Sequence, residues 1–214
     1  MEMANEWSRT ALLIIDFQRD FFDERSVFAV PGAYAILPSV YDALECARKR
    51  GMFVVWVVRE HDPEGRDVER FRRHLYGSGK QNPVSKGSIG AELIEGFEIK
   101  EGEYKLVKTR FSAFFNTNLH SLLQATGITD LVICGVQTPN CIRQTVFDAI
   151  SLDYHSITVL YDATAAASVQ IHHDNITDME NVGVVVVRVD QWDGSVVEPL
   201  PPLPTMGNVV SAGK

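Results

Sequence analysis

Cysteine is scarce in this sequence: among 214 residues there are only Cys46, Cys134 and Cys141. An odd number without framework spacing excludes a disulfide scaffold of the kind found in small secreted proteins, and it is typical of a reducing compartment. The segment MEMANEWSRT at the N-terminus lacks the basic and then apolar order of a secretory signal. We therefore expect a cytoplasmic protein.

Long apolar runs and an excess of positive charge are also missing. No run approaches the roughly 20 residues that are needed to span a bilayer, and the net charge is -8. Nothing would offset the repulsion between this charge and phosphate groups. The fullest basic stretch, residues 66–73, is interrupted by Asp67 and Glu69 and reads as a solvated helix face. We therefore expect neither a membrane partner nor a nucleic-acid partner.

The length and composition are those of one globular domain. Apolar residues make up 45% of the chain, and a chain of this size can bury roughly 70% of its unfolded surface without a metal or disulfide staple. Residues 196–214 hold four of the nine prolines and show no periodicity. We expect a domain over residues 1–195 and an extended or disordered tail over 196–214.

Apolar runs alternate with amphipathic helical patterns along the chain. The runs predict strands at residues 11–15, 52–58, 104–109, 131–136, 157–161 and 182–187. The patterns predict helices at residues 36–50, 117–126, 142–152 and 171–181, and a short helical segment that begins at 92. Strands that are apolar on both faces indicate a parallel sheet covered on both sides. We predict a three-layer α/β/α sandwich with a six-stranded, doubly wound, Rossmann-like sheet.

Ligands of such sheets bind at the carboxyl ends of the strands. The residues that follow the predicted strands are Asp16, then Arg59, Glu60 and His61, then Lys108 and Arg110, then 135–141, then Asp162 and Thr164. The polar, glycine-rich segment 59–90 is long enough to indicate a functional or mobile loop. No histidine has a partner at metal-ligand spacing, and His172 and His173 are predicted to be solvated on a helix.

Cys141 follows the turn Thr138-Pro139-Asn140 at the predicted start of a helix. The positive end of the helix dipole would favour the thiolate and lower the pKa of the thiol, as in a nucleophile. The alternative is a small buried apolar residue, which is our interpretation of Cys46 and Cys134. The pattern alone leaves both readings of Cys141 open.

Lys108 and Asp16 also have two readings each. Lys108 interrupts an apolar strand and is either a strand-edge residue or a buried cation that favours a thiolate. Asp16 follows five apolar residues and is either a turn residue or a general base. Their placement at strand ends, together with Cys141, favours a catalytic site.

Three blocks carry a resemblance to a known family: ALLIIDFQRDF at 11–21, VKTRFSAFFNT at 107–117 and VICGVQTPNCI at 132–142. In this order they resemble the isochorismatase-like cysteine hydrolases, over residues 10–188. That family includes nicotinamidases, N-carbamoylsarcosine amidohydrolase and ureidoacrylate amidohydrolase. The likeness is closest to the plant nicotinamidase-like branch.

The resemblance implies a catalytic triad of Asp16, Lys108 and Cys141. It also implies a cis peptide bond between Val136 and Gln137, and an oxyanion hole formed by the N–H groups of Gln137 and Cys141. The activity that it implies is hydrolysis of a small amide, ureido or carbamoyl C–N bond through a thioester-type intermediate. No organic cofactor is required, and a homo-oligomer, a dimer or tetramer, is expected.

The chain departs from the metal-dependent nicotinamidases in one motif. They carry Asp-x-His after the second strand, where this chain has Arg59-Glu60-His61, so we expect no bound metal. Arg59 and Arg110 are candidates for binding a substrate carboxylate, because arginine pairs with it bidentately. Gln18 could bind a carboxamide. Phe21 could line the pocket or pack in its loop, and Phe111, Phe114 and Phe115 could form an apolar wall or an oligomer contact.

Three other functions compete with the amidohydrolase. One is a nicotinamidase without the usual metal site. Another is an isochorismatase-type vinyl-ether hydrolase, against which Cys141 counts because such members of the family generally lack the nucleophilic cysteine. The last is a catalytically silent family member that acts as a binding protein.

Overall fold

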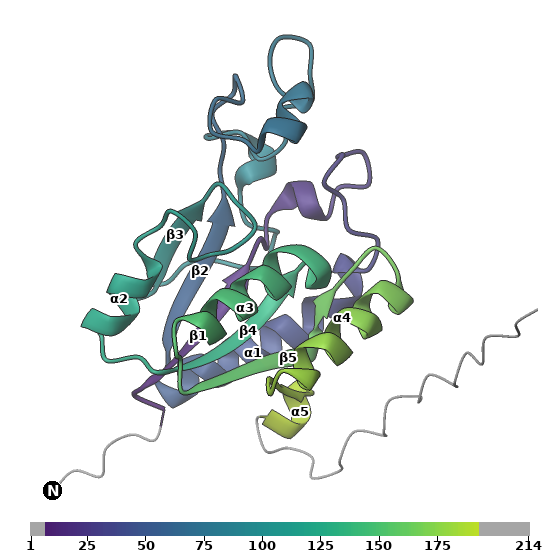
Figure 1. Ribbon diagram of the computed structural model, residues 1–214. Coiled ribbons are helices and arrows are strands. Elements are labelled where there is room, and N and C mark those ends of the chain that lie inside the picture. The colour runs from purple at the N-terminus through teal and green to yellow at the C-terminus, as the bar shows by residue number, and fades with distance from the viewer. Residues whose placement is uncertain (1–6, 193–214) are drawn as a thin grey trace, which may run out of the picture.

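The computed structural model describes residues 7–192 and consists of one parallel sheet between two layers of helices (Figure 1). The predicted tail at 196–214 lies outside the described residues. The strands are β1 (Thr10–Ile15), β2 (Phe53–Arg59), β3 (Tyr104–Lys108), β4 (Asp130–Val136), β5 (Ser156–Ala165) and β6 (Val185–Val187). The α-helices are α1 (Leu37–Arg50), α2 (Leu119–Ala125), α3 (Arg143–Ser151), α4 (Val169–Asn181) and α5 (Val189–Trp192).

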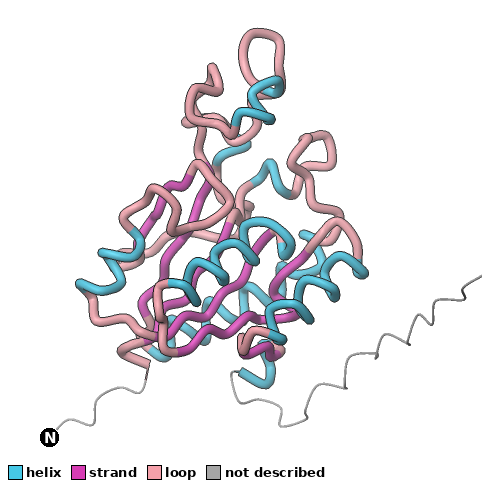
Figure 2. Tube along the Cα trace, in the orientation of Figure 1, coloured by secondary structure: helices cyan, strands magenta, loops and turns pink. Residues whose placement is uncertain are grey.

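The two faces of the sheet bury two separate cores. Successive side chains of a strand point to opposite faces, so Leu12 and Ile14 pack towards α1, whereas Leu13 and Ile15 pack towards α2, α3 and α4. Figure 2 shows the strands between these two helical layers. The predicted three-layer sandwich is therefore confirmed.

The strand order is β3-β2-β1-β4-β5-β6, with every pair parallel. The order reverses beside β1, which pairs with both β2 and β4. The chain leaves β1 and β4 towards opposite sides at this point, and the carboxyl ends of the two strands open into a crevice. The long segment between β2 and β3 projects beyond the same end of the sheet (Figure 1).

Most predicted bounds lie within two residues of those in the structure, and three predictions differ by more. β5 continues to Ala165, because its register against β4 shifts between Ile133 and Gly135 and pairing resumes at Thr164. β6 begins only at Val185, since Gly183 adopts a φ of 95° in the turn after α4. The predicted short helix at 92 is instead a 3₁₀ turn over Ile89–Ala91, after which Leu93 forms an isolated bridge with Gln18.

Gly135 is required where β4 meets β1. Its φ is 111°, and a Cβ atom placed there would lie 2.1 Å from the carbonyl oxygen of Ile15. We expect Gly135→Ala to lower the free energy of unfolding by at least about 2 kcal/mol, through backbone strain and this clash. Chemical denaturation measures the loss. Gly102→Ala is the control, because Gly102 has a φ of 87° but nothing within 4 Å; equal losses in the two variants would contradict the clash.

Candidate active site

The three residues of the predicted triad come from the carboxyl ends of three strands. Asp16 follows β1 with a φ of 54°, and its N–H donates to the carbonyl of Val57 at 2.8 Å. Lys108 is the last residue of β3. Cys141 lies in a single π-helical turn, Thr138–Ile142, between β4 and α3. The turn begins before the predicted helix start at 142, and Pro139 lies in its first turn, where a missing N–H costs nothing.

The structure brings these three side chains together. Lys108 Nζ lies 2.8 Å from Asp16 Oδ2 and 3.2 Å from Cys141 Sγ, and it also donates to the carbonyl of Arg110 at 3.3 Å. Asp16 and Lys108 are fully buried, and Cys141 is 4% exposed. The other carboxylate oxygen of Asp16, Oδ1, has no hydrogen-bond partner among the described residues. It is therefore the acceptor that is available for the thiol proton.

The predicted lowering of the Cys141 pKa was wrong. Burial raises the pKa of this thiol, and the negative charge of Asp16 raises it further, while Lys108 and Arg59 act in the opposite direction. The loss of solvent is the largest of these effects, and a prediction from the helix terminus alone did not include it. The resting residue is thus a thiol beside a carboxylate, which is the protonation state from which a general base can activate it.

This protonation state predicts how the thiol reacts with an alkylating agent. Because the pKa of Cys141 is raised, the thiolate fraction is small at pH 7 and grows as the pH rises towards that pKa. We expect the labelling rate by iodoacetamide to climb through a midpoint above about 8.5, the value of an ordinary thiol. Peptide mass spectrometry at each pH measures it. A midpoint below that value would contradict the raised pKa.

Hydrogen bonds fix the turn that carries Cys141 from both sides. Thr145 Oγ1 donates to the carbonyl of Cys141 at 2.7 Å and accepts from the N–H of Ala113 at 3.0 Å. The hydroxyl of Thr138 lies 2.8 Å from Nδ1 of His172. The prediction that His172 is solvated was wrong, since it is 9% exposed. Its helical position carried no signal of this contact.

The peptide bond between Val136 and Gln137, just before this turn, is cis. Gln137 and Cys141 both line a cavity of about 60 Å³ above the triad. The other residues that line it are Phe21, Val27, Phe28, Arg59, Arg72, Phe111 and Asn140. Of the five residues that were predicted to bind substrate, Phe21 and Arg59 thus line this cavity.

The other three predicted binding residues point elsewhere. The amide of Gln18 is fully buried and bonds the backbone of Arg59 and the carbonyl of Ala91. Arg110 donates to the carbonyls of Asp67 and Thr109. The ring of Phe114 packs 5.5 Å from that of Tyr154. None of these three side chains lines the cavity.

The segment between β2 and β3 supplies a part of the cavity that the sequence did not indicate. The predicted solvated helix face over residues 66–73 is correct only in part. Arg70–Leu75 is a 3₁₀ helix on which Arg70 and Arg73 are exposed. Glu69, by contrast, is 7% exposed and pairs with Arg59 at 3.0 Å. Arg72 lies over the rings of Phe28 and Phe111, at 5.1 and 4.8 Å from their centroids. Only the interruption of the basic run by acidic residues gave any signal.

The residues after β2 do not fit a metal ion. His61 is 1% exposed, its Nδ1 lies 3.2 Å from Asp67 Oδ1, and its Nε2 lies 3.4 Å from Arg59 Nη1. Burial and the charge of Arg59 lower the pKa of His61 to about 4. A guanidinium thus occupies the side of the ring where a cation would bind. Within residues 7–192, no group of three His, Cys, Asp or Glu side chains could hold a metal.

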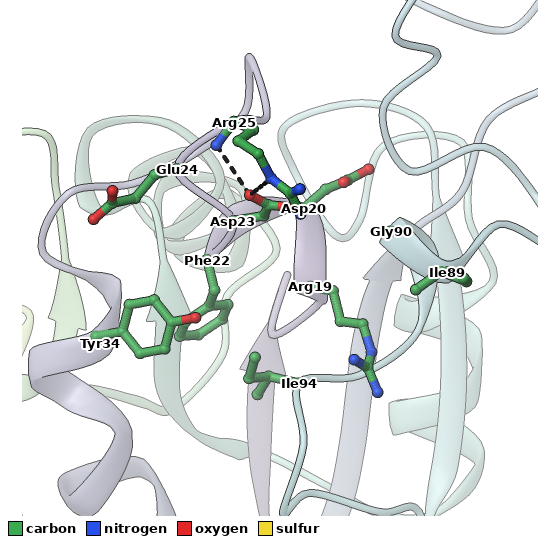
Figure 3. Close-up of a pocket in the computed structure, with 10 residues that line it drawn as sticks. All are labelled: Arg19, Asp20, Phe22, Asp23, Glu24, Arg25, Tyr34, Ile89, Gly90 and Ile94. Carbon is green, nitrogen blue, oxygen red and sulfur yellow. Dashed lines mark hydrogen bonds and ion pairs between the residues drawn. The ribbon is translucent and has the colours of Figure 1, made fainter.

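A larger hollow of about 740 Å³ lies on the loop after β1 (Figure 3). Its lining includes Arg25, which pairs with Asp23 at 2.8 Å, and the exposed side chains of Tyr34 and Ile89. No residue of the triad lines it. The candidate active site is therefore the small cavity above Cys141 and not this hollow.

No helix in the part of the chain that the structure describes is long and apolar enough to cross a membrane.

Comparison with known proteins agrees with this geometry. The isochorismatase domain model matches residues 10–191. The chain is 60% identical to a probable inactive nicotinamidase of Arabidopsis thaliana, over 89% of this chain and 97% of that one. It is 30% identical to a ureidoacrylate amidohydrolase of Caulobacter segnis, over 74% and 73%. An isochorismatase family protein from Desulfovibrio vulgaris superimposes with a TM-score of 0.84 at 39% identity, covering 87% of this chain and 97% of that one. The chain therefore belongs to the isochorismatase family of hydrolases.

Proposed function

We propose that this protein is a cysteine-dependent amidohydrolase that cleaves a C–N bond of a small amide, ureido or carbamoyl compound. The observation that carries the proposal is the buried contact of three groups: Lys108 Nζ lies 2.8 Å from Asp16 Oδ2 and 3.2 Å from Cys141 Sγ. The three groups lie out of solvent at the carboxyl ends of the strands of a doubly wound sheet. They supply a nucleophile, the thiol, a base, the aspartate, and a cation, the lysine.

In the first half of the reaction, Oδ1 of Asp16 takes the proton of the Cys141 thiol. The thiolate attacks the carbonyl carbon of the substrate, while Lys108 stabilises the charge that appears on sulfur. The N–H groups of Gln137 and Cys141 would hold the tetrahedral oxyanion. The C–N bond then breaks, and Asp16 gives its proton to the nitrogen, so ammonia or an amine leaves.

In the second half, water hydrolyses the thioester. Asp16 is again unprotonated and takes a proton from the attacking water. The carbonyl carbon forms a bond to the water oxygen, the C–S bond breaks, and the proton returns to sulfur. The acid product leaves with the triad in its starting state.

A second candidate is a binding protein without catalysis. It is favoured by the small size of the cavity, about 60 Å³, and by the raised pKa of the nucleophile. The Arabidopsis relative is named as a probable inactive nicotinamidase. That name concerns one substrate, and the metal motif that distinguishes nicotinamidases is the part of the site that differs here. All three residues of the proposed triad are present, and Lys108 contacts the other two.

The test is ammonia release from a panel of small amides, ureas and carbamoyl compounds that includes nicotinamide. We expect at least one member to be hydrolysed, and brief acid quenching to reveal an acyl adduct on the peptide that contains Cys141, by mass spectrometry. Isochorismate, assayed by product formation, tests the vinyl-ether alternative. A protein that binds members of the panel but releases no ammonia would support the silent binding protein instead.

A further inference from the structure

Arg59 is placed beside the catalytic residues by the sheet. It is the last residue of β2 and stands in register with Lys108 on β3. Its side chain is 1% exposed and lines the cavity above Cys141. Burying an arginine is costly unless its charge and its donors are satisfied, so the partners of this guanidinium indicate what the cavity receives.

Only one side of the Arg59 guanidinium is satisfied. Nη1 donates to Glu69 at 3.0 and 3.3 Å and lies 3.4 Å from Nε2 of His61. Nε and Nη2 are buried and have no hydrogen-bond partner among the described residues. These two nitrogens form the edge of the guanidinium that pairs with a carboxylate through two parallel N–H···O bonds.

The charges around the cavity also favour an anion. Lys108 is offset by Asp16, and Arg59 by Glu69. Arg72 adds a further positive charge over the ring of Phe111, which also lies 5.3 Å from Arg59.

We propose that the Nε and Nη2 edge of Arg59 binds a carboxylate of the substrate, and that the substrates are small amido or ureido acids. This inference rests on the proposed amidohydrolase function. Arg59 and Cys141 line the same cavity of about 60 Å³, so a linker of only a few atoms separates the carboxylate from the carbonyl that is attacked. Arg72 draws the acid into the cavity and is a positioning residue.

Ligand binding to a Cys141→Ala protein tests the carboxylate site in the absence of catalysis. Succinamate and butyramide differ only by a carboxylate in place of a methyl group, and so do N-carbamoylglycine and ethylurea. Isothermal titration calorimetry should give an affinity about 100-fold higher for each acid than for its neutral partner, as expected for a buried charged hydrogen-bonded pair. Equal affinities within a pair would overturn the proposal.

Variants of Arg59 in the same Cys141→Ala background locate the effect. Arg59→Gln should remove most of the preference for the acid. Arg59→Lys should keep a part of it, because lysine retains the positive charge but lacks the two parallel N–H donors of the guanidinium. The matched control is Arg110→Gln, which removes a neighbouring arginine that does not line the cavity. An equal loss of preference in the Arg110 variant would contradict the assignment to Arg59.

Arg59→Gln leaves the buried Glu69 without its partner and could unfold the protein. The double variant Arg59→Gln/Glu69→Gln avoids this, because it replaces the ion pair by two neutral amides. It should fold and show no preference for the acids. A folded double variant that still prefers them would overturn the proposal.

Ammonia release by the wild-type protein separates this inference from the proposed function. Tight binding of the acids to the Cys141→Ala protein, with no ammonia from the wild type, would leave the anion site standing and remove the amidohydrolase. Hydrolysis of butyramide and succinamate at the same kcat/KM, with equal binding, would support the amidohydrolase and remove the anion site. We expect the wild type to be an amidohydrolase and to have the anion site, with kcat/KM about 100-fold higher for succinamate than for butyramide.

Discussion

The Cys141→Ala variant is expected to release ammonia at least about 10⁴-fold more slowly than the wild type, from any amide that the wild type hydrolyses. The reason is the covalent step: without sulfur, neither Asp16 nor Lys108 can form the acyl intermediate. The loss should appear in kcat, because the cavity keeps its other lining residues. Ammonia release at saturating substrate measures it.

Cys134→Ala is the matched control for this variant. Cys134 is also buried, but it lies in β4 and packs in the core on the α1 side of the sheet. Its removal should cost some stability and leave kcat within about twofold of the wild type, since it contacts no reacting atom. If Cys141→Ala and Cys134→Ala lost activity equally, or if Cys141→Ala kept most of it, Cys141 would not be the nucleophile.

The second large effect concerns stability. Lys108→Met should lower the free energy of unfolding by about 3–5 kcal/mol, because it leaves the fully buried carboxylate of Asp16 without its partner. Asp16→Asn should also destabilise the protein, since it leaves the buried ammonium of Lys108 facing a neutral amide. Urea denaturation at pH 7 measures both variants.

The double variant Asp16→Asn/Lys108→Met completes this cycle. With both charges gone, no uncompensated ion is left in the interior, and the stability should recover towards that of the wild type. Activity should not recover, because the base and the cation are both missing. An additive loss in the double variant would show that the two side chains do not form the buried pair that the structure describes.

The sequence predicted the architecture well because its signal is local. Five apolar residues before Asp16, and comparable runs elsewhere, identify strands buried on both faces. The predicted end of β5 and the predicted start of β6 were wrong, because they depend on the register shift opposite Gly135 and on the turn at Gly183. Those are properties of the assembled sheet.

For the candidate site, some residue positions were predicted correctly, but pKa values and side-chain partners were not. The positions of Asp16, Lys108 and Cys141 followed from their strand ends. The direction of the Cys141 pKa did not, because it is set mainly by burial, which the sequence pattern does not show. Glu69 and Arg72 could not be assigned, because a segment without periodicity gives no signal of where it folds back. Gln18 was assigned to the substrate because nothing local shows that its amide is already bonded to the backbone.

Those bonds of Gln18 have a consequence for how such proteins diversify. One amide bonds to Arg59, the last residue of β2, and to Ala91, in the 3₁₀ turn that precedes β3, and so it holds together the two ends of residues 60–90. Insertions in this segment that keep Glu69 against Arg59 and the N–H of Val84 on Asp20 would leave β1 and Asp16 in place. Natural selection could therefore change the length and sequence of the segment between β2 and β3 while Asp16, Lys108 and Cys141 keep their positions.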